Sequence, residues 1–251
     1  MRRLWILFSL VALLAACAPE FQIAKPTISI PQPSLPQVPV ALLPGNALPF
    51  ADDFEQYPVG ALLPAVNPKA HRLWFAQEER HNDIAYVAEA VGPSGRTERV
   101  AAVRYPWGGG GGLATLVTGA EGWKNYRVEA VFKTEDDQWW VFGNINGNGT
   151  HAYVLEVYGQ TARVYKQIHR DRTVVARREI SGPKNDGGWH RLVAECREDG
   201  FRVVVDGEVF ADYQDADPAF SRGGFGLQAS RFGRRFWISA WSFVPLGANA
   251  R

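Results

Sequence analysis

Residues 201–213 read F-R-V-V-V-D-G-E-V-F-A-D-Y, and this segment is the clearest guide to the fold class. Two runs rich in valine and aromatic residues, 201–205 and 208–213, are separated by Asp206-Gly207. Such residues favour β-strands. An Asp-Gly pair accepts the positive φ angles that a two-residue hairpin turn requires. The segment therefore predicts a β-hairpin.

The same kind of pattern recurs from about residue 70 to the end of the chain. Residues 126–132 read Y-R-V-E-A-V-F, an alternation that is typical of a strand with one buried face. Glycine-rich breaks follow Trp107 and fall at 144–149 and 185–188. We expect roughly ten to twelve short strands and no helix, which predicts an all-β fold, either an antiparallel two-sheet β-sandwich or a jelly roll.

Several segments resemble known β-sandwiches. In chain order they are Asp52–Glu55, Gly188–Val193 (G-W-H-R-L-V), Asp206-Gly207, Gly223–Leu227 (G-G-F-G-L) and Phe236–Val244. The first and last are similar to the opening and closing strands of concanavalin A-like jelly rolls. The middle three resemble the W-x-x-L, D/N-G and G-G-x-G-L run of the laminin-G-like and 3-keto-disaccharide-hydrolase-like members. The resemblance implies one concanavalin A-like domain over residues 50–251. It does not imply one activity, because the fold serves lectins, glycosidases, lyases and adhesion modules.

The N-terminus has the features of a targeting segment. A basic start, Met1–Arg3, precedes an apolar run, Leu4–Leu14, that is too short to span a bilayer. The run ends in L-A-A-C, which resembles a bacterial lipobox. The resemblance implies that residues 1–16 are a lipoprotein signal peptide and that Cys17 is lipidated. The expected location is the cell envelope, with the protein lipid-anchored and facing the periplasm or the exterior.

Residues 17–49 are expected to form a tether. Eight of the 16 prolines fall here, as in P-Q-P-S-L-P-Q-V-P at 31–39. Proline fixes φ and favours the extended polyproline II conformation. At about 3.1 Å per residue the segment would reach roughly 90 Å. We expect it to hold residues 50–251 clear of the membrane.

Charge and cysteine content narrow the choice of partners. The chain has 27 Lys and Arg against 26 Asp and Glu, and removal of Arg2 and Arg3 makes the net charge −1. This balance predicts neither nucleic acid nor an anionic membrane surface as a partner, so the lipid anchor is the membrane contact that we expect. Cys196 lies in an alternating run and is expected to be a small buried side chain without a disulfide.

Glycoside hydrolysis is the first catalytic alternative. Jelly-roll glucanases carry an E-x-D-x-E strand, which puts two carboxylates about 5 Å apart on one face. The chain contains no such motif, and Glu156 stands alone on the strand expected at 153–158.

A polysaccharide lyase is the second alternative. Gln167-Ile168-His169 is similar to the Q-I-H triplet of alginate-lyase-type jelly rolls, which implies partner strands R-x-E-x-R and Y-x-K-x-G-x-Y. The sequence R-T-E-R at 96–99 is followed by Val100 where the last arginine should stand, and 235–241 contains neither Tyr nor Lys. The sequence thus favours a binding protein. A polysaccharide-active enzyme, hydrolase-like or lyase-like, is the alternative, and a structural or protein-interaction envelope lipoprotein is the second alternative.

The hairpin around Gly159-Gln160 predicts a binding face. Alternation sends Tyr153, Leu155, Val157, Val164 and Ile168 to the core, together with Trp139 of the preceding strand. Candidate carbohydrate-binding residues on the opposite face are Trp140, Asn144, Glu156, Tyr158, Arg163, Tyr165, Gln167 and His169. Aromatic rings stack on sugars and planar polar groups bond their hydroxyls, which predicts a poly- or oligosaccharide ligand. An ordinary solvated sheet face is the competing interpretation. The basic run Arg170, Arg172, Arg177 and Arg178 could be a solvated loop and strand or an anion site, and we expect the former.

Ca²⁺ is the one cofactor that the sequence leaves as a candidate. Related folds clip the first and last strands with Ca²⁺ held by carboxylates and carbonyls. Asp52 and Asp53 lie at the start, but no Asp or Glu follows Asp217, so the acidic partner in the closing strand is missing. The five histidines lack zinc spacing.

Overall fold

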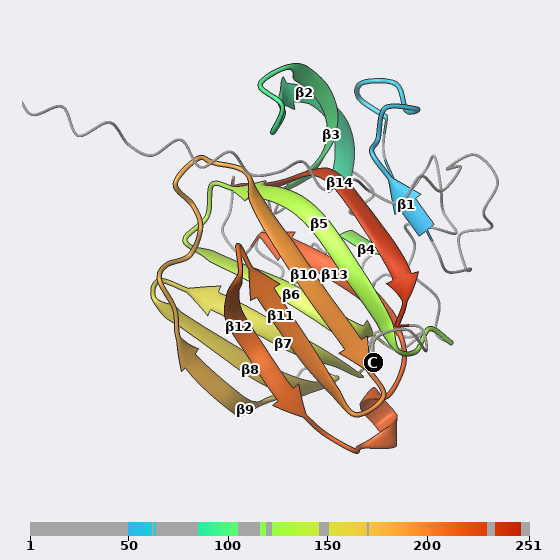
Figure 1. Ribbon diagram of the computed structural model, residues 1–251, viewed down its shortest axis with the longest axis vertical. Helices are drawn as coiled ribbons and strands as arrows, with labels where there is room; N and C mark the ends of the chain where they lie inside the picture. The colour runs from blue at the N-terminus through green and yellow to red at the C-terminus, as the bar shows by residue number, and fades with distance from the viewer. Residues whose placement is uncertain are drawn as a thin grey trace, which may run out of the picture. The chain divides into compact units, whose positions relative to one another are not determined.

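The computed structural model describes residues 50–61, 63, 85–104, 116–118, 122–145, 151–169, 171–229 and 234–246. The expected signal peptide, lipidated Cys17 and tether lie outside these residues. Two antiparallel sheets face each other (Figure 1). Within the described ranges, no helix is long and apolar enough to cross a membrane.

The first sheet has the order β12-β11-β10-β5-β14-β3-β2, with β1 paired to β14. Its strands are β1 (Phe50–Asp52), β2 (Ala85–Val91), β3 (Thr97–Arg104), β5 (Tyr126–Thr134), β10 (His190–Arg197), β11 (Gly200–Val205), β12 (Glu208–Gln214) and β14 (Arg235–Pro245). The second sheet has the order β4-β13-β6-β7-β8-β9. Its strands are β4 (Leu116–Thr118), β6 (Gln138–Ile145), β7 (His151–Tyr158), β8 (Thr161–Ile168), β9 (Asp171–Glu179) and β13 (Gly224–Ala229).

The predicted fold class is confirmed. The opening strand β1 pairs with the closing strand β14, with Phe50 opposite Phe243. Strands β11 and β12 form the expected hairpin, in which Asp206 and Gly207 have φ angles of 50° and 83°. The described residues form 14 strands, more than the ten to twelve expected, and β4 has only three residues, too few for alternation to be recognised.

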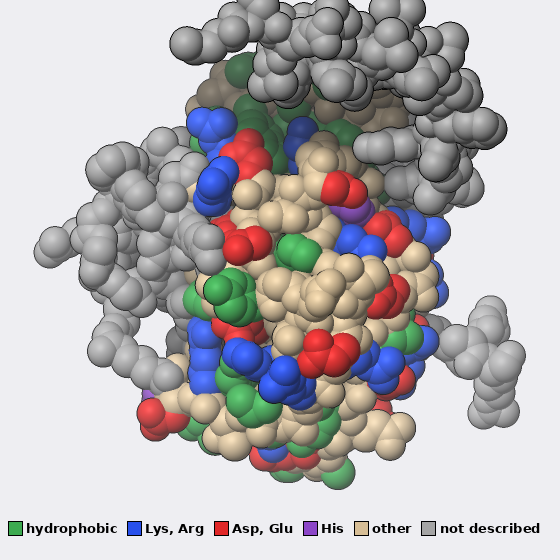
Figure 2. Space-filling view, turned by 90° about the vertical axis from the view of Figure 1, so that its left-hand side faces the viewer, with side chains coloured by type: hydrophobic (Ala, Val, Ile, Leu, Met, Phe, Trp, Pro, Cys, Tyr) green, Lys and Arg blue, Asp and Glu red, His purple; other side chains and the backbone are tan. Residues whose placement is uncertain are grey.

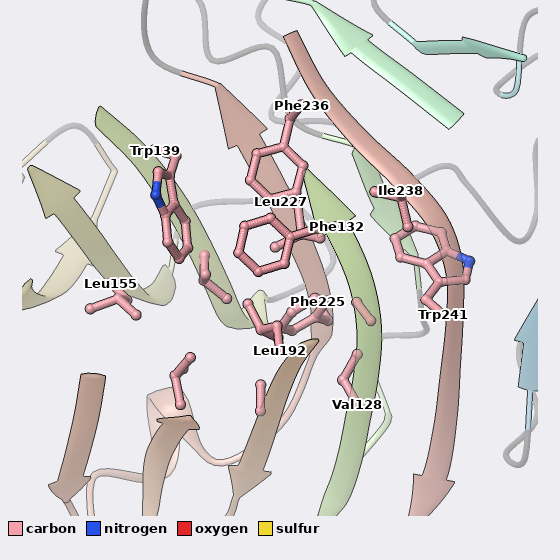
Figure 3. Close-up of a cluster of buried hydrophobic side chains, with 14 of the residues drawn as sticks. Val128, Phe132, Trp139, Leu155, Leu192, Phe225, Leu227, Phe236, Ile238 and Trp241 are labelled. Carbon is pink, nitrogen blue, oxygen red and sulfur yellow. The ribbon is translucent and has the colours of Figure 1, made fainter. Parts of the chain in front are cut away.

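The core lies between the two sheets and is rich in aromatic side chains (Figure 3). Phe132 stacks on Phe236 at 4.9 Å between ring centroids and lies 5.2 Å from Trp139. The buried Trp139 indole donates a 2.6 Å hydrogen bond to the Pro183 carbonyl oxygen, which satisfies its one polar atom. Trp139 therefore points inward, as predicted, and Cys196 is buried and free.

The inner side of β8 ends in an ion cluster rather than in apolar packing. Lys166 Nζ lies 2.6 Å from an Asp215 carboxylate oxygen and 2.8 Å from one of Asp217. It also sits 4.5 Å from the centroid of Phe220, in the short 3₁₀ helix η3 (Pro218–Phe220). Ile168 is 44% exposed. The prediction that Ile168 faces the core is wrong, because it is the last residue before the β8–β9 turn.

Charge on the surface is mixed in sign. Figure 2 shows one side of the molecule, where acidic and basic side chains are interspersed and neither gathers into a broad patch. The view agrees with the near balance of acidic and basic residues in the sequence.

Candidate functional site

The candidate face is the side of β6, β7, β8 and β9 that points away from the first sheet, called the outer face below. Antiparallel register places Trp140 opposite Glu156, and Glu156 opposite Arg163. The next row along the same strands places Val154 opposite Tyr165. Directly opposed residues have side chains within reach of each other, so alternation along three separate strands converges on one site.

Glu156 is the centre of this site. Its Oε1 accepts hydrogen bonds from Gln138 Nε2 at 2.7 Å and from Trp140 Nε1 at 3.4 Å. Its Oε2 accepts from the Tyr165 hydroxyl at 2.6 Å and pairs with Arg163 Nη1 at 3.4 Å. Glu156 is only 8% exposed. Two oxygens therefore hold four donors in a fixed arrangement.

The pKa of Glu156 reflects this arrangement. Burial acts to raise it, but the hydrogen bonds from Tyr165, Gln138 and Trp140 and the charge of Arg163 outweigh burial, and the net pKa is lowered. Each of these groups favours the charged form. The carboxyl group is therefore ionised at neutral pH, as an acceptor and not as a proton donor.

Gln167 and Arg172 form a second polar group on the outer face. Gln167 is 2% exposed, and its Oε1 accepts a 2.9 Å hydrogen bond from Arg172 Nε. The Arg172 guanidinium lies 4.7 Å from the centroid of the Trp140 ring. Strands β9 and β6 are separated by two others, about 14 Å at the usual spacing of neighbouring strands. The two side chains therefore extend toward each other across the face.

An apolar cluster lies against this polar network. Phe142, Ala152 and Val154 are fully buried, and Trp140 and Tyr165 pack against them. A sheet face turned to solvent would normally be polar at these alternate positions. The outer face is thus more than a solvated surface: aromatic and planar polar side chains are seated on an apolar base.

A β-bulge in β9 separates Arg172 from Arg177. The β8–β9 register shifts by one residue and leaves Val175 unopposed. As a result Arg172 lies opposite Gln167 while Arg177 lies opposite Arg163, on the same face. In an unbroken strand, residues five positions apart point to opposite faces. The interpretation of Arg172 as a solvated residue was wrong, and the sequence does not mark the bulge.

Asn144 does not join the outer face, contrary to the prediction. It is fully buried with φ 52°, and its Nδ2 donates to the carbonyl oxygens of Arg197 at 2.9 Å and Phe220 at 2.7 Å. The β6–β13 register is irregular at this point. Asn144 therefore does not share a face with Trp140, although the two are an even number of residues apart. Its hydrogen bonds instead connect β6 to the end of β10 and to η3.

His169 does not join the outer face either. It lies in the β8–β9 turn with φ 55°, and its ring is 6.2 Å from that of His151. Gln167 is buried while His169 is exposed. The Q-I-H triplet therefore does not bring its Gln and His to one site. Tyr158, at the end of β7 and 46% exposed, lies at the rim.

The outcome for the eight candidates is mixed. Those that the structure brings together are Trp140, Glu156, Arg163, Tyr165 and Gln167, with Tyr158 at the rim. Gln138 and Arg172 belong to the network and were missed. Alternation from Trp140 could have found Gln138, which lies two positions earlier on the same strand.

The described residues contain no group of three His, Cys, Asp or Glu that could hold a metal ion. Asp52 Oδ1 accepts from the Phe54 backbone N–H at 2.8 Å, and Oδ2 accepts from the Tyr57 hydroxyl at 2.9 Å. Both oxygens thus have protein partners. A Ca²⁺ ion at Asp52 and Asp53 stays a prediction.

No family model and no curated protein matches this chain. Similar solved structures include a glycoside hydrolase family 16 endo-glucanase from Bacteroides ovatus (10% identity, 78% of this chain and 99% of that chain, TM-score 0.46). Others are the carbohydrate-binding module CBM66 from Bacillus subtilis (17%, 58% and 83%, TM-score 0.41) and the galectin LEC-6 from Caenorhabditis elegans (9%, 57% and 94%, TM-score 0.40). These similarities concern the fold alone. The chain is an all-β protein of two packed antiparallel sheets, a β-sandwich.

Proposed function

We propose that this protein is a non-enzymatic glycan-binding module that takes a poly- or oligosaccharide on the outer face of β6–β9. The observation that carries the proposal is the position of Glu156 between Trp140 and Tyr165, fixed by four donors. A site whose polar groups are already oriented loses less entropy on binding. Such a site suits a ligand with many hydroxyls and apolar ring faces.

The partly exposed side chains supply the two kinds of contact that sugars need. Trp140 and Tyr165 offer ring surface, and Gln138 and Arg163 offer N–H donors beside it. Aromatic rings pack against the C–H faces of sugars, and planar amide and guanidinium groups bond hydroxyl oxygens. These residues lie on strands β6 and β8, on either side of β7, which would hold them more rigidly than loops.

The chemistry of Glu156 supports binding over hydrolysis. A retaining glycosidase needs a second carboxylate at about 5–5.5 Å and one group that can donate a proton. Glu156 has a lowered pKa and accepts from donors only. On β9 of the same sheet, the exposed carboxylate of Glu179 is already engaged in an ion pair, 3.1 Å from Arg177.

The proposal includes anchoring through Cys17 and the 17–49 tether, which would present this face away from the envelope membrane.

Binding to a panel of neutral and acidic polysaccharides, measured by isothermal titration calorimetry on the full chain, tests the proposal. We expect Tyr165→Ala to weaken binding at least about tenfold, since it removes both ring surface and a Glu156 donor. The matched control is Glu179→Gln on the edge strand, which should leave affinity unchanged. Absence of binding, or equal binding by wild type and Tyr165→Ala, would contradict the proposal. New reducing ends or an unsaturated-uronate absorbance would instead establish the enzymatic alternative.

A further inference from the structure

Among the described residues, the guanidinium of Arg172 has no acidic partner. Its Nε donates to the neutral Gln167 Oε1, and its flat side lies against Trp140. Within the same part of the chain, Arg172 forms no ion pair with a carboxylate and no further hydrogen bond. Four of its five N–H donors are therefore uncommitted there.

Six other arginines on the two sheets differ in this respect. Pairs with a carboxylate are Arg127–Glu129, Arg163–Glu156, Arg177–Glu179, Arg191–Glu129, Arg197–Glu195 and Arg202–Asp212. Arg172 is also half-buried, and burial lowers its pKa although Glu156 and Tyr165 oppose that effect. A cation taken from water without a counter-charge is costly. An arginine stays charged even so, which leaves a site that favours an anion.

Glu156 does not neutralise Arg172. Each Glu156 oxygen already has two donors, and its charge is matched by Arg163. The network around Glu156 and Arg172 thus carries two guanidinium groups against one carboxylate. Arg177 adds no further uncompensated charge because it pairs with Glu179.

We propose that the outer face selects an acidic glycan, and that Arg172 binds the carboxylate of a uronic acid residue through its two terminal nitrogens. This inference rests on the proposed function. The planar fork of a guanidinium matches the two oxygens of a carboxylate. Gln167 fixes the Nε edge and Trp140 covers one flat side, so the edge formed by the terminal nitrogens is left for the ligand. Arg172 is then the residue that determines specificity, while Trp140 and Tyr165 contact the sugar ring.

The test compares three matched ligands by calorimetry on the full chain. They are an oligogalacturonate, its methyl ester, and a sulfated oligosaccharide of the same length that carries no carboxylate. We expect the free acid to bind at least about tenfold more tightly than the ester, as for a charge-assisted bidentate contact. Arg172→Gln should remove this ratio while it preserves affinity for the ester, and Arg172→Lys should restore only part of it. Arg177→Gln on the same strand is the control, and it should keep the full ratio.

The outcomes separate this inference from the proposed function. Equal affinity for the acid and the ester, or an acid preference that survives Arg172→Gln, overturns the role of Arg172 and leaves glycan binding intact. Tight binding of the sulfated ligand with no effect of esterification overturns the carboxylate assignment. Failure of every glycan to bind overturns both. Ester affinity retained by Arg172→Gln shows that this variant is folded.

Discussion

Replacement of Glu156 by glutamine removes one negative charge from the outer face and keeps the shape of the side chain. The four donors around the carboxylate then face one oxygen and one NH₂ group. In either orientation of the amide, its NH₂ group faces side chains that donated a hydrogen bond to the carboxylate, so donor faces donor. The ion pair with Arg163 is also abolished. The Tyr165 hydroxyl is the partner that can rotate to accept, so part of the network is retained and part is broken.

The expected cost follows from the hydrogen bonds that the substitution breaks. Hydrogen bonds to a charged group contribute about 1.5–3 kcal/mol each in net stability, and one such bond is broken outright. We expect Glu156→Gln to lower the free energy of unfolding by about 2 kcal/mol at pH 7. In a domain of this size, that corresponds to a fall in Tm of roughly 4–8 °C.

The pH dependence gives the sharper test. The pKa of Glu156 is lowered in the folded protein, so the stabilisation is complete above the unfolded value of about 4.3. It is lost as the pH falls through the folded pKa. The gap in unfolding free energy between wild type and variant should be constant from pH 8 to about pH 5. It should shrink below about pH 4.

Urea unfolding curves at pH 7, 5 and 3, followed by tryptophan fluorescence, measure this gap. Glu179→Gln is the control, because that exposed carboxylate pairs only with Arg177 among the described residues and should change stability by less than about 0.5 kcal/mol. A gap of the same size at pH 7 and pH 3 would show that the charge of Glu156 contributes nothing. A variant more stable than the wild type would equally contradict the expected cost.

Two further predictions concern the packing of β6. Gly143→Ala should destabilise by about 1–3 kcal/mol, as in other overpacked cores, because the new Cβ would lie 2.4 Å from a Phe201 ring carbon; thermal unfolding measures the loss, and an unchanged Tm would contradict it. Asn144→Ala should cost about 2–4 kcal/mol, because the buried Phe220 carbonyl oxygen and the part-buried Arg197 carbonyl oxygen lose a donor and alanine is strained at a φ of 52°. Asn144→Gly loses the same hydrogen bonds without the strain. Its free energy of unfolding should therefore be about 1 kcal/mol higher than that of Asn144→Ala. Equal stability of the two would show that the φ angle adds no cost.

The fold was accessible from the sequence because its evidence is local. Alternation in the strands and the Asp206-Gly207 turn each depend on a few neighbouring residues. The inward position of Trp139 and the buried, unpaired state of Cys196 followed from the same period of two. The outer-face positions of Glu156 and Tyr165 also followed from it, since β7 and β8 pair without interruption at Glu156.

The errors at the site have one physical origin. Asn144 and His169 lie where the period of two is broken, by an irregular register and a turn respectively. Arg172 precedes a β-bulge that changes its phase relative to Arg177. Two of them, Asn144 and His169, have a positive φ that no glycine announces. Which residue of a strand bulges depends on its pairing partner, and that information is not local.

The bulge at Val175 also bears on how this face changes over evolution. Because Val175 has no partner in β8, deletion of one residue from 173–175 can be absorbed by closing the bulge, and Arg172 then stays opposite Gln167. Among the described strands, β9 is an edge strand with one neighbour, so the change disturbs a single ladder. A deletion inside β7, which pairs on both sides, would instead turn every side chain beyond it to the other face. Homologues that keep the same ligand are therefore expected to tolerate a one-residue gap at 173–175 and none in β7.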